Sequence, residues 1–107
     1  MTVDSMRQFM GRFEEILAEL DALCGGCDGE TAEDFEDMNA ELEDALMLLA
    51  EQEKGGDGWR EDVIGTLEDI QALAGDYNVL ANEVPGLEAL ADRLDENAAA
   101  ALEALEA

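Results

Sequence analysis

Histidine is absent from this chain of 107 residues, and its absence removes a large class of functions. Histidine is the most frequent general base and the most frequent metal ligand in proteins. Ser-His-Asp and Cys-His catalytic arrangements are therefore excluded, as are the Glu-x-x-His ligand pairs of di-iron bundles. Glycine motifs for phosphate or dinucleotide binding are lacking, and the acidic segments after Asp28 and Asp57 do not have EF-hand spacing. We expect no enzymatic activity, no cofactor and no bound metal.

Aromatic residues, proline and long apolar runs are also scarce. The chain has five aromatic residues and one proline, and its longest purely apolar run spans only residues 45–50. A run of this length is too short to cross a bilayer, and the opening Met1-Thr2-Val3-Asp4 does not resemble an export signal. Nearly half of the residues are apolar, which is enough for a packed core. We expect one soluble, cytoplasmic domain over residues 1–107.

Apolar residues recur at steps of three and four in four segments, which is the spacing of amphipathic helices. The first segment runs from Ser5 to Gly25, the second begins near Thr31 and the third begins at Trp59. Pro85 ends the third segment and is predicted to lie in the first turn of the fourth. Their apolar stripes are Met6, Phe9, Phe13, Ile16, Leu17, Leu20 and Leu23; Phe35, Met38, Leu42, Ala45 and Leu49; Val63, Leu67, Ile70, Ala74, Tyr77, Ala81 and Val84; and Leu87, Leu90, Leu94, Ala98, Ala101 and Leu105. The pattern predicts an all-α fold, an antiparallel four-helix bundle. Three or five helices remain alternatives, depending on whether Gly75 interrupts the third.

Basic residues are the scarcest functional group. Five Lys and Arg stand against 29 Asp and Glu, which gives a formal net charge of −24. Such a surface repels nucleic acid and anionic membranes, so we expect direct binding to neither. We expect a basic protein as the partner instead. The imbalance is uneven, because no base lies between Arg12 and Lys54, and residues 28–57 hold 12 of the 29 acids.

The second helix concentrates these acids on the face opposite its apolar stripe. At 100° per residue, one row runs along the middle of that face and two rows flank it. The candidate partner-binding residues are Glu33, Asp34, Glu36, Asp37, Glu41, Glu43, Asp44 and Glu51. Like charges three or four residues apart cost about 0.2–0.5 kcal/mol per pair. Lysine at some of these positions would have been stabilising, so the pattern favours negative charge over helix stability.

A nucleic-acid mimic explains this choice of charge. A helix of about 24 residues is roughly 36 Å long, and duplex DNA carries about 21 phosphate charges over that length. The net charge of −24 is close to this density. In size, charge and helicity the chain resembles the small acidic inhibitors that phages use against restriction or CRISPR systems. The resemblance implies a protein that blocks the basic groove of a nucleic-acid-binding protein.

Two other hypotheses explain the acidic composition differently. The first is a generic helical adaptor that binds a partner, or a second copy as a homodimer, through an apolar patch. Met47 and Leu48 lie off the apolar stripe of the second helix and are the candidate contact residues. The second is adaptation to a high-salt cell, for which acidic, lysine-poor surfaces are typical. Salt adaptation predicts evenly spread charge, whereas the acids here are concentrated in one segment.

Cys24-Gly25-Gly26-Cys27 is the one familiar cysteine motif in the chain. Redox pairs of this kind place the reactive thiol at a helix N-terminus, where the helix dipole lowers its pKa. This pair falls at a predicted helix C-terminus with Asp21, Asp28 and Glu30 nearby, so we expect a raised thiol pKa. A zinc site needs four ligands, and this motif supplies two. We expect structural cysteines, with a metal or disulfide between two chains as the alternative.

Overall fold

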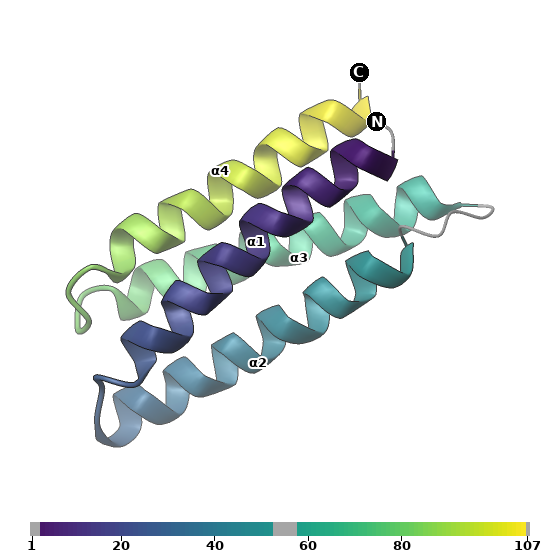
Figure 1. Ribbon diagram of the computed structural model, residues 1–107. Helices are drawn as coiled ribbons and strands as arrows, with labels where there is room; N and C mark the ends of the chain where they lie inside the picture. Colours follow the sequence, from purple (N-terminus) through teal and green to yellow (C-terminus); the bar gives the residue numbers. More distant parts are fainter. Residues whose placement is uncertain (1–2, 53–57, 107) are drawn as a thin grey trace.

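The computed structural model describes residues 3–52 and 58–106 of the chain. They form four α-helices, α1 (Val3–Cys24), α2 (Gly29–Gln52), α3 (Trp59–Leu80) and α4 (Leu87–Glu106). Each helix packs on two neighbours, α1 on α2 and α4, and α3 on α2 and α4. Successive helices run in opposite directions, so the fold is an antiparallel four-helix bundle (Figure 1). The predicted fold class is therefore confirmed.

The bundle is an elongated rod. Its principal extents are 44 × 20 × 19 Å. The α1–α2 and α3–α4 turns lie together at one end, and the two termini lie at the other end (Figure 1). We call the first of these the turn end and the second the terminal end. Because α2 and α3 are antiparallel, the N-terminal half of α2 lies beside the C-terminal half of α3 at the turn end.

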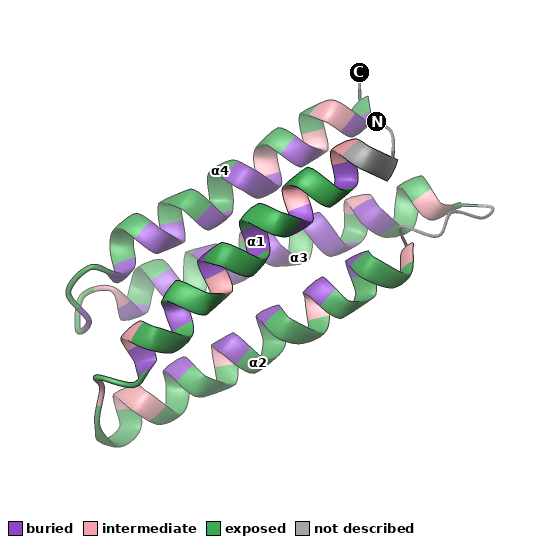
Figure 2. Cartoon of the chain, viewed as in Figure 1, coloured by how far each residue is buried: buried purple, intermediate pink, exposed green. Residues whose placement is uncertain are grey.

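The core contains one side of every helix, as the apolar stripes predict. All six stripe residues of α4 are buried, and Phe13, Leu20, Phe35, Leu42 and Val63 are fully buried on the other three helices. Figure 2 shows this division on α2, where buried residues follow the edge that faces the other helices. Full burial of each large apolar side chain contributes about 1.5–3 kcal/mol. The exposed edge of α2 contributes nothing to the core and is free for another role.

The core stripe of α2 differs from the predicted one by a small rotation. Asn39 and Leu46 are buried, whereas the predicted Met38 and Ala45 are only half-buried. The pattern of three and four steps fits both stripes, but a polar residue such as Asn39 is not predicted to be buried. Its burial has a partner that the sequence does not reveal, because the Tyr77 hydroxyl donates a hydrogen bond of 2.7 Å to Asn39 Oδ1.

Helix boundaries correct three details of the predicted pattern. Helix α3 runs unbroken through Gly75, so the three-helix and five-helix alternatives are wrong. Helix α3 ends at Leu80 rather than continuing to Val84, and Val84 is buried from the following turn. Pro85 precedes α4 by two residues instead of lying in its first turn. Proline disfavours helical backbone at the residue before it, which explains why the helix does not reach Val84.

Candidate functional site

The predicted partner-binding residues all lie on the outer side of α2. The eight acids are exposed, and α2 contains nine acids and no Lys or Arg among its 24 residues. We call these eight residues the acidic face: Glu33, Asp34, Glu36, Asp37, Glu41, Glu43, Asp44 and Glu51. The face follows most of the length of the rod. Over 44 Å duplex DNA carries about 26 phosphate charges, close to the net charge of −24 on this chain.

Three members of the acidic face meet a second helix. Asp34, Asp37 and Glu41 line a groove between α2 and α3, and Asp76 and Glu83 line its opposite side. We call this the α2–α3 groove; its volume is about 550 Å³. The other five acids of the acidic face are not among its lining residues. The groove therefore gathers five carboxylates from separate parts of the chain at the turn end.

Apolar side chains also line the α2–α3 groove. Met38, Val79 and Leu80 line it together with Asn82, and the described lining residues include no base. Val79 is 73% exposed, the largest exposed fraction among the described large apolar side chains. Sequence reasoning missed Asp76, Val79 and Glu83 because it treated α2 alone. A sequence signal for the groove was present in Val79, an apolar residue that lies off the apolar stripe of α3 and close to the acidic Asp76.

Two hydrogen bonds fix α2 against its neighbours beside this groove. The Tyr77 hydroxyl of α3 donates to Asn39 Oδ1, and Asn39 Nδ2 donates to Asp21 Oδ1 of α1 at 3.0 Å. The chain of three side chains thus crosses from α3 through α2 to α1. Burial raises the pKa of Tyr77 well above its ordinary range, and the Asp21 and Glu41 carboxylates act in the same direction. The phenol therefore stays protonated and remains a donor.

At the turn end a further hydrogen bond orients one rim of the groove. The Thr31 hydroxyl donates to the Glu83 carboxylate at 3.1 Å, which joins the first turn of α2 to the α3–α4 turn. At the terminal end, Gln52 and the Thr66 hydroxyl are hydrogen-bonded at 3.2 Å. The helix pair that carries the groove is therefore held together at both ends and at Asn39 in between. Its carboxylates are presented on a rigid support.

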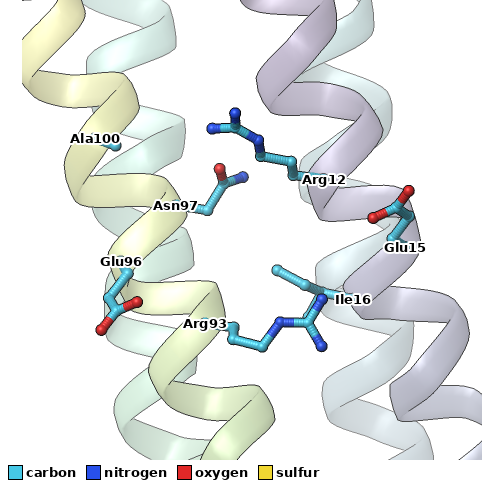
Figure 3. A pocket seen from close by; sticks show the side chains of 7 residues that line it. All are labelled: Arg12, Glu15, Ile16, Arg93, Glu96, Asn97 and Ala100. Atoms are coloured by element: carbon cyan, nitrogen blue, oxygen red, sulfur yellow. The ribbon is translucent and has the colours of Figure 1, made fainter.

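The opposite side of the bundle has a different electrostatic character. Figure 3 shows the groove between α1 and α4, where the Arg12 and Arg93 side chains reach into the space between the two helices. Arg93 pairs with Glu19 across these helices, and the Arg12 guanidinium lies 5.7 Å from the centre of the Phe9 ring. Three of the five basic residues of the sequence are on α1 and α4. This groove is therefore mixed in sign, whereas the α2–α3 groove is uniformly acidic.

The predicted apolar contact residues are exposed. Met47 is 61% exposed and Leu48 is 50% exposed on the C-terminal half of α2. They lie toward the terminal end of the rod, away from the α2–α3 groove, and the acidic residues Glu43, Asp44 and Glu51 are their exposed neighbours along the helix. Two exposed apolar side chains among acids form a small patch rather than the large apolar surface typical of an obligate dimer.

Both cysteines are free thiols: Cys24 is the last residue of α1, and Cys27 lies in the turn that follows. Cys24 is buried and donates to the Ala32 carbonyl at 3.8 Å, whereas Cys27 donates to the Leu23 carbonyl at 3.6 Å. Burial raises the pKa of the Cys24 thiol, and the Glu36 carboxylate raises it further. A raised Cys24 pKa is the direction that the sequence predicts; burial is its largest cause, and Asp21, one of the predicted acids, also contributes. A buried thiol with a raised pKa is a poor nucleophile.

Within residues 3–52 and 58–106, no group of three Cys, Asp or Glu side chains is arranged to hold a metal ion. In the same part of the chain, no helix combines the length and the apolar character needed to cross a membrane. Carboxylates are the most frequent charged groups at the described surface, and they attract basic surfaces.

Comparison of the chain with protein-family models, with curated proteins and with solved structures finds no match.

Proposed function

We propose that this protein is a non-enzymatic, acidic binding protein that occupies the basic nucleic-acid-binding groove of a partner protein. The acidic face of α2 carries the proposal, because eight exposed carboxylates follow a rod 44 Å long with no base on the same helix. Carboxylates on a rigid helix replace phosphates without the entropy cost of ordering a flexible chain.

The distribution of arginines also supports a partner that docks on the α2 side of the bundle. Arg12 and Arg93 are confined to the α1–α4 side, and Arg60 is at the first turn of α3, about 24 Å along the helix from Asp76. A cationic partner that approaches α2 and the C-terminal half of α3 therefore meets no opposing base there among the described residues. Complementary charge of this kind speeds encounter and rejects wrong partners. The inhibitors of restriction and CRISPR systems that the chain resembles act on targets of this class.

The immobilised protein should capture a nucleic-acid-binding protein from a bacterial lysate, and competing duplex DNA should displace it. The reason is that carboxylates and phosphates would occupy the same basic groove. Raised salt should weaken capture as well, because exposed charges are screened over about 8 Å at physiological ionic strength. Mass spectrometry of the fractions eluted with DNA and with salt measures this outcome. Partners that resist both DNA and salt would contradict the proposal.

Such resistant partners would favour the second candidate function, a helical adaptor that uses Met47 and Leu48. The exposure of these two side chains is the observation that supports it. Replacing either by Asp would then remove partner binding, whereas changes on the acidic face would have little effect. A homodimer through this patch requires two chains of net charge −24 to approach each other, which is unfavourable at low salt.

The protein should remain folded in dilute buffer of about 10 mM ionic strength, where the Debye length is about 30 Å. Self-repulsion among the acids then lowers the thermal midpoint, but the buried core of four helices retains the fold. Circular dichroism during thermal unfolding, at low and at physiological salt, measures the effect. Loss of helical signal at 25 °C in dilute buffer would instead indicate that the acidic surface is an adaptation to high salt.

A further inference from the structure

The α2–α3 groove has a feature that a plain phosphate mimic does not need. Its lining combines five carboxylates with Val79, which is 73% exposed beside Asp76, and the half-buried Met38. An exposed valine beside Asp76 costs hydration free energy in the free protein and gains nothing from the nearby charges. A second molecule that covers Val79 would recover that cost.

The width of the groove limits what can enter it. Packed helix axes are about 8–10 Å apart, so the space between α2 and α3 admits a row of side chains rather than a whole helix. A volume of about 550 Å³ is sufficient for several long side chains. The occupant must therefore lie along the groove and insert side chains from one of its faces.

The charges on the two sides of the groove determine which side chains of the occupant fit there. Asp34, Asp37 and Glu41 span about 10.5 Å along α2, which equals two turns of a helix lying alongside. Asp76 and Glu83 face them from the other side. Arg and Lys carry aliphatic stems that cover apolar surface while their charged heads stay at the rim. An apolar side chain between two such residues would fit on Val79 and Met38.

A second copy of this chain does not fit this description. Its α2 has no base, and its exposed Arg12 and Arg93 lie beside Glu15, Glu19 and Glu96. Two copies would bring like charges together at the rim. The occupant must come from a chain that is rich in Arg or Lys, and such a composition is common on helices that enter the DNA major groove.

We propose that the α2–α3 groove receives a basic amphipathic helix of the partner, with one apolar side chain on Val79 and Met38 and flanking Arg or Lys residues against the two carboxylate rims. This inference rests on the proposed function and specifies where the partner docks. The groove is preorganised for it, because the Tyr77–Asn39 hydrogen bond of 2.7 Å and the Thr31–Glu83 hydrogen bond hold α2 and α3 together. Binding therefore requires little rearrangement.

Two synthetic peptides of about 16 residues, long enough to form a helix, test the groove. Both carry arginines three and four residues from a central position, which is Leu in one peptide and Ser in the other. The full-length protein should bind the Leu peptide about fivefold more tightly than the Ser peptide, because the leucine covers the exposed part of Val79. Fluorescence anisotropy with labelled peptides measures both affinities.

Val79→Ser should abolish the preference for leucine and leave the affinity for the Ser peptide unchanged, because no charge is altered. Met47→Ser is the matched control: it removes an exposed apolar side chain of α2 outside the groove and should behave like the unmodified protein. Both substitutions are at exposed positions, and circular dichroism confirms that the variants are folded.

Three results would overturn the groove proposal: no binding of either peptide, equal affinity for the two peptides, or a leucine preference that survives Val79→Ser. Equal affinities that still fall with salt would leave the proposed function intact, since electrostatic binding would remain. Failure of the proposed function has a different signature, namely capture of a lysate partner that DNA does not displace. The two failures are therefore distinguishable.

Discussion

Reversal of Asp37, Glu41 and Asp44 to Lys is expected to weaken partner binding at least 100-fold while the helical bundle remains folded. Two of the three residues line the α2–α3 groove, and all three lie on the acidic face. Each substitution replaces an attraction to a basic surface by a repulsion. A loss of about 2.8 kcal/mol in binding free energy corresponds to 100-fold, and like charges brought together at an interface cost several kcal/mol.

The same substitutions should stabilise the free protein. Asp37 now repels Glu33 and Asp34, and Lys at 37 would attract both of them instead, whereas the 37–41 and 41–44 pairs stay like-charged in the triple variant. Pairs of this kind contribute about 0.2–0.5 kcal/mol each, so the net gain is about 1–2 kcal/mol. Increased stability together with lost binding identifies a surface that is selected for its charge rather than for folding.

Glu88, Asp92 and Glu103 of α4 provide the matched control, because they are exposed and their reversal to Lys changes the net charge by the same amount. The control variant should keep binding within about threefold if the position of the charges matters more than their sum. Isothermal titration with the captured partner compares the variants, and thermal unfolding confirms that they are folded. An equal loss in both triple variants would show that only the total charge counts.

The periodicity of apolar residues was sufficient to predict the fold. Leucine and alanine at steps of three and four determine which side of each helix is buried, and all six predicted stripe residues of α4 are in the core. This pattern depends on local spacing alone, so the buried side of a helix can be predicted without knowing which helices pack beside it. The acidic face follows from the same arithmetic, because the side opposite a buried stripe is exposed.

The α2–α3 groove could not be predicted in this way. It depends on which helices are adjacent, on their antiparallel register and on the rotation of α2. The rotation depends on Asn39, a polar residue that is only 5% exposed and that apolar patterns ignore. The register brings Val79 and Met38, which are 41 positions apart in the sequence, to the lining of one groove. Such long-range placement requires the packed structure.

The Asn39 hydrogen bonds should be the largest single polar contribution to the stability of the bundle that a point substitution can remove. Asn39→Ala leaves the buried Tyr77 hydroxyl without its acceptor and opens a small cavity between α2 and α3. An unpaired buried polar group costs about 1–3 kcal/mol, and the lost volume adds to this. We expect the free energy of unfolding to fall by about 3 kcal/mol. Urea denaturation measures it.

Combining Asn39→Leu with Tyr77→Phe tests the origin of that loss. The double variant removes donor and acceptor together and fills the space with apolar groups, so it should recover most of the stability that Asn39→Ala loses. Asp21 is exposed and can exchange its bond with Asn39 Nδ2 for water at little cost. Asn39→Leu alone, Tyr77→Phe alone and the double variant form, with the unmodified protein, a double-mutant cycle. Its coupling energy measures the Tyr77–Asn39 interaction directly. A coupling energy near zero would show that this hydrogen bond does not hold α2 against α3, and the rigid presentation of the acidic face would then depend on the apolar core alone.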